Sequence, residues 1–213
     1  LQISPYNFDW YRGDEQISDL VVFSESGMDK VDNYNEKIKV AFLLESPLIS
    51  GAYYDKMKDP NFYNKFDIIL TFDDSLIKLN PDKFKYYAFG GCWIYPENQK
   101  IYDKSKNLSI VSSGKRSTEG HILRHSIIKT FRPLIDGLFG NGYHFVENKL
   151  EALKDYRYSI VIENDNRGSM FSEKIIDCFM TGTIPIYWGC DGKIGDFFNT
   201  DGIIQFNNES EFG

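Results

Sequence analysis

A strand–turn–helix–strand pattern across residues 158–190 is the feature that most constrains the fold of this chain. Residues 159–162 form a short apolar run, as expected for a strand that is buried in a parallel sheet. Ser172 is placed to cap a helix that Gly182 ends, and residues 184–188 return to the sheet. The connection is short enough to be one right-handed crossover, so the pattern predicts a βαβ unit.

Polar residues gather in the turn of this unit and at the start of its helix. Ligands of open parallel sheets bind beyond the carboxyl ends of the strands, where Glu163, Asn164 and Arg167 stand. A phosphate there would meet the unpaired N–H groups of the helix start and the charge of Lys174, and Glu173 would accept hydrogen bonds from sugar hydroxyls. On spacing alone, an ordinary first-turn acid beside a solvated lysine explains this pair better.

The same segment resembles the donor-binding signature of the glycosyltransferase family 10 fucosyltransferases. The signature runs from a Glu-Asn pair through a Thr-Glu-Lys helix start to an apolar strand that ends in Tyr-Trp-Gly. This chain matches it at Ile162-Glu163-Asn164, Gly168, Ser172-Glu173-Lys174, Ile184-Pro185-Ile186-Tyr187-Trp188-Gly189 and, further on, residues 196–199 and 203–206. The departures are Ser172 in place of threonine and an aromatic one place late, at Phe171, which stays a candidate for contact with donor or acceptor.

The resemblance implies a GT-B-like α/β fold, in which two Rossmann-like domains face a cleft. Strands and helices that alternate along the chain predict an α/β protein with parallel sheets independently of the family. We expect residues 1–100 to form the acceptor-side domain and residues 101–213 the donor-binding domain, with a linker near residues 95–107. Because the family normally continues past the last strand, we expect this chain to be truncated.

Short apolar runs predict the elements outside the signature. In the first half, strands are expected at residues 20–23, 39–44, 66–72 and 86–89. In the second half we expect a strand at 108–112, a helix at 121–132, a short strand at 144–145 and a helix at 148–156.

Glu45 follows the apolar run 39–44 and precedes a Ser-Pro pair. By residue type alone it is a turn carboxylate that caps nearby N–H groups. The fucosyltransferases carry a similar Glu-Ser-Pro, so the resemblance implies that Glu45 is the general base that takes the proton of the acceptor hydroxyl. Their Asp-Ser element is resembled by Asp74 and the serine after it, which makes Asp74 a weaker candidate for holding the acceptor.

Arg124 lies on the helix predicted at residues 121–132. The family carries an arginine at this place that contacts the donor pyrophosphate, and an arginine fork suits phosphate oxygens. A few extra loop residues leave Lys115 and Arg116 as rivals for that contact. A surface arginine on an amphipathic helix is the alternative interpretation of Arg124.

The resemblance also implies the chemistry of the leaving group. In a GT-B enzyme, basic side chains and a helix terminus stabilise the departing diphosphate, so we expect no catalytic metal and no cofactor besides the donor substrate. The pair Glu163 and Asp165 only faintly resembles a metal-binding Asp-x-Asp.

Composition narrows the partners and the location. A net charge of −7 over 213 residues gives no support to nucleic-acid binding. No apolar run approaches the roughly 18 residues of a membrane span, and no signal peptide opens the chain, which starts at Leu1 rather than Met. A bacterial or viral source would then predict a cytoplasmic or peripheral membrane location. Three cysteines without a close pair argue against a disulfide framework, and Cys178 is expected to be a small core residue.

Taken together, the expected function is that of an inverting glycosyltransferase that moves fucose from GDP-fucose to a hydroxyl of a glycan acceptor. One alternative is a transferase of the same fold that uses another nucleotide sugar. The other is a non-catalytic or fragmentary protein that binds carbohydrate or nucleotide. The sequence leaves open the acceptor, the linkage, membrane association and the oligomeric state.

Overall fold

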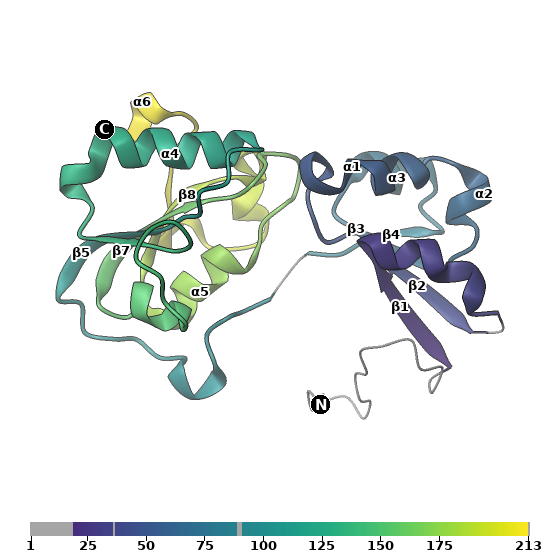
Figure 1. The fold of residues 1–213 in the computed structure, drawn as a ribbon, viewed down its shortest axis with the longest axis horizontal. Coiled ribbons are helices and arrows are strands. Elements are labelled where there is room, and N and C mark those ends of the chain that lie inside the picture. The colour runs from purple at the N-terminus through teal and green to yellow at the C-terminus, as the bar shows by residue number, and fades with distance from the viewer. Residues whose placement is uncertain (1–18, 36, 89–90, 213) are drawn as a thin grey trace.

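The computed structural model describes residues 19–35, 37–88 and 91–212, which fold into two α/β lobes lying side by side (Figure 1). Each lobe is built on its own parallel sheet, as the alternation of strands and helices predicts. The segment between the sheets runs from Tyr86, where the first sheet ends, to Lys106, where the second begins.

The sheet of the N-terminal lobe has four parallel strands in sequence order. They are β1 (Leu20–Ser24), β2 (Ile38–Phe42), β3 (Ile68–Thr71) and β4 (Phe84–Tyr86). The 3₁₀ helix η1 (Glu25–Asn33) packs on the same face of it as three α-helices, because Met28 and Val31 of η1 belong to one core cluster with Tyr54 and Leu76 of these helices. These helices are α1 (Pro47–Lys56), α2 (Pro60–Tyr63) and α3 (Asp74–Leu79).

The sheet of the C-terminal lobe has five parallel strands in the order β6-β5-β7-β8-β9. They are β5 (Lys106–Val111), β6 (Gly137–Phe139), β7 (Tyr156–Ile162), β8 (Ile184–Trp188) and β9 (Ile204–Gln205). The longest strand, β7, lies at the centre, so its carboxyl end falls between the ends of its neighbours. Side chains that follow β7 are therefore placed in the middle of one sheet edge.

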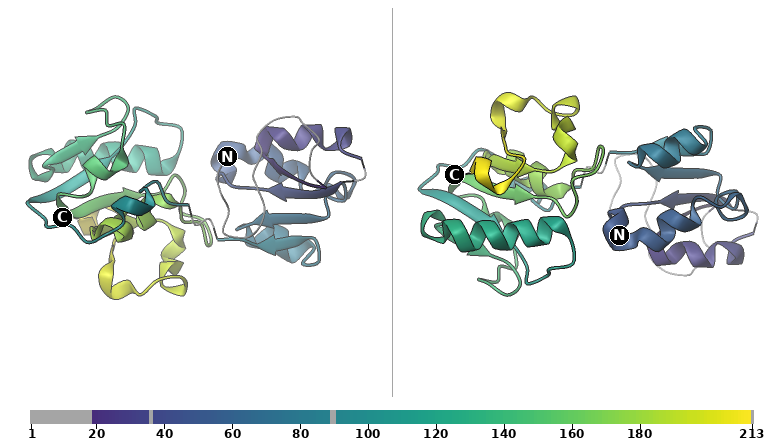
Figure 2. Two further views of the ribbon diagram at one scale, coloured as in Figure 1. Left: turned by 90° about the horizontal axis from the view of Figure 1, so that it is seen from below. Right: turned by 90° about the horizontal axis from the view of Figure 1, so that it is seen from above.

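Two helices cover opposite faces of this sheet, α4 (Glu119–Phe131) on one side and α5 (Glu173–Thr181) on the other (Figure 2). The alternation of side chains along β7 explains this, because successive residues of a strand point to opposite faces. Ile160 and Ile162 pack in the same cluster as Ile127 of α4, whereas Val161 packs with Ile175 of α5. Both faces of β7 are thus buried.

Shorter elements complete the lobe and connect it to the first. They are the helix α6 (Glu209–Phe212) and the 3₁₀ helices η2 (Pro96–Asn98), η3 (Arg132–Leu134), η4 (Lys149–Ala152), η5 (Cys190–Asp196) and η6 (Thr200–Gly202).

The helix and the second strand of the βαβ unit have the bounds that the sequence predicts, whereas its first strand, β7, begins at Tyr156 rather than at residue 159. Ser172 caps α5, Gly182 ends it in the left-handed conformation with φ +65°, and β8 covers residues 184–188. Cys178 is buried in the core, as expected. The predicted helix 121–132 is present as α4 and begins two residues earlier, because Thr118 rather than a later residue accepts the capping hydrogen bond.

Three predicted elements need correction. The strand expected at residues 144–145 is wrong: β6 lies at Gly137–Phe139, and His144 forms only an isolated bridge to Phe139. The helix expected at 148–156 is only the 3₁₀ turn η4, because β7 already begins at Tyr156. The strand expected at 86–89 is displaced toward β4, and Phe89 lies outside the described residues.

The turn after β7 joins the two lobes. Asp165 Oδ2 accepts a hydrogen bond of 2.6 Å from Ser46 Oγ, and both residues are buried. Met170 is buried among the core side chains of the N-terminal lobe. On the other side of the junction, the rings of Tyr86 and Phe197 stack with centroids 6.1 Å apart. The turn is therefore held from both lobes.

In the described parts of the chain, no helix is both long and apolar enough to cross a membrane.

Candidate active site

Glu163 is the residue that organises the turn after β7. Its side chain is fully buried, and Oε1 accepts a hydrogen bond of 2.9 Å from the backbone N–H of Ser172. Oε2 accepts from Ser172 Oγ at 2.7 Å and from Lys174 Nζ at 2.9 Å. This carboxylate thus fixes the first residues of α5 and holds the lysine that is expected to meet an anion.

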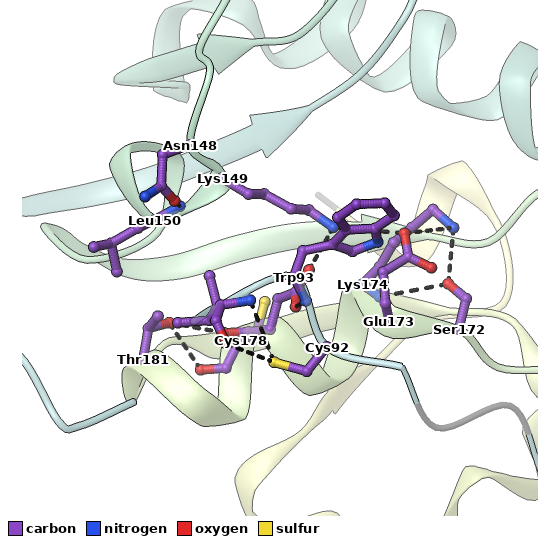
Figure 3. A network of polar contacts seen from close by, with 12 residues as sticks. Cys92, Trp93, Asn148, Lys149, Leu150, Ser172, Glu173, Lys174, Cys178 and Thr181 are labelled. Carbon is purple, nitrogen blue, oxygen red and sulfur yellow. Dashed lines mark hydrogen bonds and ion pairs between the residues drawn. The ribbon is translucent and has the colours of Figure 1, made fainter. Parts of the chain in front are cut away.

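Glu173, the first residue of α5, lies near the charges of Lys149 on η4 and of its neighbour Lys174, drawn in Figure 3. Lys149 Nζ lies 3.6 Å from Glu173 Oε1 and 2.5 Å from Oδ2 of Asp177, which is fully buried. Lys174 Nζ lies 3.9 Å from Glu173 on its other side. Burial alone would raise the pKa of Glu173, but the charges of Lys174 and Lys149 lower it below its usual range.

The start of α4 meets the same turn. Thr118 caps the helix by accepting from the N–H of His121 at 3.2 Å. Gly120 in the first turn lies against the backbone of Glu163: a Cβ at this position would lie 1.8 Å from the Glu163 carbonyl oxygen. Only glycine permits this approach. The N-termini of α4 and α5 therefore converge on the end of β7, and each adds partial positive charge there.

Arg124 is buried and points to the end of β7. Its Nε and Nη2 donate to the carbonyl oxygen of Ile162 at 3.0 and 2.6 Å, and Nη2 also donates to Asn164 Oδ1 at 2.8 Å. Among the described residues, no hydrogen-bond acceptor is found for Nη1. Nη1 is also not one of the side-chain atoms there that are both fully buried and without a partner. Two nitrogens therefore anchor the guanidinium to the turn, and the third stays open to a ligand.

Several positive charges converge beside His121. Burial is the main reason that the pKa of His121 is lowered to about 4, so the imidazole is neutral at pH 7. Neighbouring cations add to this effect, and they are Arg124, Lys115 and Lys174. The charges of side chains from α4, α5 and the loop before α4 thus all act on the His121 imidazole. Arg124 and Lys174 therefore lie at the same sheet edge.

Glu45 faces this edge from the other lobe. The backbone N–H of Glu45 donates to the Glu25 carboxylate at 3.2 Å, and the backbone carbonyl of Glu45 accepts a hydrogen bond of 2.8 Å from Tyr54 OH. No hydrogen bond from a described residue reaches the Glu45 carboxylate. The side chain is exposed, yet the surrounding protein raises its pKa, and Glu25 and Glu173 add to the rise.

The charges of Lys174 and Lys115 act in the opposite direction on Glu45 without cancelling the rise in its pKa. Glu45 is therefore close enough to the C-terminal lobe to sense its charges. A carboxylate with a free lone pair and a raised pKa is suited to accept a proton.

The structure separates the two rivals of Arg124. Lys115 acts electrostatically on both Glu45 and His121, which places it with the site. Arg116 instead lines a hollow of about 480 Å³ beside α4, together with Lys129 and Tyr143.

Phe171 and Asp74 occupy less favourable positions. Phe171 is buried, and its ring packs on those of Phe197 and Phe198 with centroids 4.9 and 5.2 Å apart. Its ring is not available to a ligand, which corrects the expectation that it contacts donor or acceptor. Asp74 stands at the start of α3 with its side chain half exposed, 3.9 Å from Lys193 Nζ.

Glu163 and Asp165, the pair that faintly resembles Asp-x-Asp, each have protein partners. Glu163 is occupied by Ser172 and Lys174, and Asp165 by Ser46 and by Arg167 Nε at 3.3 Å.

Sequence reasoning missed Lys149, Asp177 and Trp93. Asp177 accepts a hydrogen bond of 2.7 Å from the backbone N–H of Trp93, a residue 84 positions away, so no local pattern reveals the contact. The sequence signal that could have revealed this contact is Asp177 itself, an acid on the apolar face of α5. Such an acid is buried only when it is paired.

The fold and the site together indicate the class of architecture to which this chain belongs. Two lobes with parallel sheets, a turn lined by Lys174 and Arg124 in one and the Glu45 carboxylate in the other form a GT-B-like α/β architecture.

Comparisons point to one group within this class. A curated α-(1,3)-fucosyltransferase, FucT of Helicobacter pylori, is 43% identical over 71 residues, which are 33% of this chain and 14% of that protein. A solved α1,3-fucosyltransferase with GDP superposes with a TM-score of 0.58 at 17% identity, and one with GDP-fucose with a TM-score of 0.56 at 20% identity. Each match covers 94% of this chain. No family model matches.

The chain thus resembles α-1,3-fucosyltransferases in a stretch of sequence and in fold. It spans 65% of the length of these two solved chains.

Proposed function

We propose that this chain is an inverting glycosyltransferase that transfers fucose from GDP-fucose to a hydroxyl of a glycan acceptor. The observation that carries the proposal is the convergence of Arg124, Lys174 and Lys115 with two helix N-termini at the end of β7. Such a set of charges suits a diphosphate. The similarity to fucosyltransferases supports GDP-fucose as the source of that diphosphate.

In this proposal the C-terminal lobe, residues 101–213, binds the donor. Arg124 Nη1 and Lys174 Nζ contact the diphosphate oxygens, and Lys115 adds charge from the loop before α4. Glu163 and Asn164 do not touch the donor directly; they hold Lys174 and Arg124 in place. Glu173 accepts hydrogen bonds from the ribose, and the charges of Lys174 and Lys149 keep its carboxylate ionised.

The transfer needs one proton acceptor. Glu45 takes the proton of the acceptor hydroxyl while the hydroxyl oxygen attacks the anomeric carbon from the face opposite the diphosphate. The bond between that carbon and the diphosphate oxygen breaks, and GDP leaves with the electron pair. Arg124, Lys174 and the start of α5 stabilise the charge that develops on the leaving oxygen, so the step needs no metal.

The acceptor enters from the N-terminal lobe, residues 1–100. A hollow of about 300 Å³ lies beside the turn that follows Glu45, and its walls include Tyr54, Asp73 and Arg167. Carboxylates, a phenol and a guanidinium are the groups that bind sugar hydroxyls. Asp73 also caps α3, so its second oxygen is the one that serves a ligand.

Turnover of GDP-fucose on a panel of glycan acceptors tests the proposal. Glu45→Gln keeps the size of the side chain and removes the base, so we expect a loss of roughly 100-fold or more in kcat, on the order of general-base contributions. Glu97→Gln, at an exposed acid on η2, is the matched control and should keep full activity. Ordinary turnover by Glu45→Gln refutes the role of this residue.

The same panel with GDP-mannose and UDP-sugars tests the choice of donor. If the wild-type chain binds GDP without transferring any sugar, the chain is a nucleotide-binding protein of this fold and the enzymatic proposal is wrong.

A further inference from the structure

Trp93 places a large aromatic side chain in solvent beside the proposed donor site. Its exposed fraction is 67%. Figure 3 shows its indole ring beside Lys149, Glu173 and Lys174. The ring of Phe171, the aromatic that the sequence offered for the donor, is buried instead.

The backbone of Trp93 is fixed although its ring is free. Its N–H donates to Asp177 Oδ1 at 2.7 Å, and Lys149 holds the other oxygen of that buried carboxylate. The next residue, Ile94, is 2% exposed and packs in the core beside α5. A buried ion pair carries a large desolvation cost. Here the pair fixes the backbone from which the indole ring projects, so the position of the turn is set in advance of any binding.

The groups along α5 follow the order of the parts of a nucleoside diphosphate. Ser172 and Lys174 stand at the helix start, where the diphosphate is proposed to bind. Glu173 comes next, and Asp177, which holds Trp93, lies on the same helix face about 6 Å further along the axis. Phosphate, ribose and base would thus meet cation, carboxylate and aromatic ring in turn.

We infer that the indole ring of Trp93 stacks on the purine base of the donor nucleotide. The inference rests on the proposed function, because the diphosphate site sets the direction in which the nucleotide lies. Flat aromatic rings bind bases through their π faces, and indole offers the largest such face among the side chains. The contact makes Trp93 a binding residue for the base and leaves the transfer step to Glu45.

Calorimetric titration of the 213-residue chain with GDP and with inorganic pyrophosphate tests the inference. Stacking on one base contributes enough that Trp93→Ala should weaken GDP binding about 5- to 150-fold. Pyrophosphate has no base, so its binding should not change. Trp93→Phe keeps an aromatic ring and should recover most of the affinity for GDP. Tyr95→Ala, at an aromatic that is 61% exposed two residues on, is the matched control and should leave both affinities unchanged.

The possible results of the titrations distinguish a failure of the stacking inference from a failure of the proposed function. Equal GDP affinity in wild type and Trp93→Ala overturns the stacking inference and leaves the proposed function intact. An equal loss of GDP and pyrophosphate binding also overturns it, because Trp93 would then only support the diphosphate site. Wild-type protein that binds neither ligand overturns the proposed function together with the inference.

Intrinsic fluorescence gives a second measurement. Stacking should quench Trp93 when GDP is added, and comparison with Trp93→Phe separates this signal from that of the other two tryptophans, Trp10 and Trp188. Quenching by GDP that is as large in Trp93→Phe as in wild type contradicts the inference.

Discussion

The substitution Glu163→Gln tests whether a buried carboxylate holds the start of α5. The glutamine side chain would keep one oxygen for the N–H of Ser172, but its NH₂ group would replace the oxygen that now accepts from Ser172 Oγ and Lys174 Nζ. The lysine would then face another donor. Hydrogen bonds to charged groups contribute about 1.5–3 kcal/mol each.

The expected size of the effect follows from the exposure of the two partners. Glu163 is fully buried, but the Lys174 side chain is 25% exposed, so solvent screens part of the ion pair. We therefore expect the free energy of unfolding to fall by about 2 kcal/mol, which lowers Tm by roughly 4–8 °C in a protein of this size.

Circular dichroism during thermal and urea unfolding measures this change. Glu119→Gln is the matched control, because Glu119 is exposed and its carboxylate accepts a single hydrogen bond of 3.2 Å from the backbone of Asn166. We expect this control to lose less than about 1 kcal/mol. Equal losses in the two variants would refute the view that Glu163 organises the site.

Three further predictions concern the same sheet edge. Gly120→Ala should lower the free energy of unfolding by more than about 2 kcal/mol, because the added Cβ would lie 1.8 Å from the Glu163 carbonyl; Gly114→Ala, with open space around it, should stay near wild type in the same melts. The acid limb of the pH profile of kcat/KM should lie above the usual pKa of a glutamate, since the base works only when ionised and the surrounding protein, by partly desolvating Glu45, raises its pKa; a limb at or below the ordinary value contradicts this assignment. His121 should stay neutral from pH 7 down to about pH 5 in an NMR titration, because burial and nearby cations lower its pKa to about 4. Bound GDP should raise that pKa, because it adds negative charge. A titration midpoint near 6.5 in the free protein would show that the cations do not converge.

The sequence predicts the βαβ unit well because its signals are local. A cap at Ser172, a left-handed glycine at Gly182 and an apolar run before and after them define three elements within one short segment. The predicted strand at 144–145 fails for the opposite reason. The real strand, β6, has three residues, and its pairing with β5 depends on residues far away in the chain.

The candidate site divides in the same way. Glu163, Glu173 and Lys174 stand close together in the signature, so sequence reasoning reaches them. The clamp formed by Lys149, Asp177 and Trp93 brings together three distant segments, and only the fold shows it. The burial of Phe171 also depends on distant partners, Phe197 and Phe198, and for that reason a motif match assigned its ring a contact that it cannot make.

A crystal structure of the chain with GDP tests the central claim most directly. We expect the diphosphate oxygens to lie within hydrogen-bonding distance of Arg124 Nη1 and Lys174 Nζ, at the start of α5. A diphosphate bound elsewhere, for example in the hollow beside Arg116 and Tyr143, would contradict it.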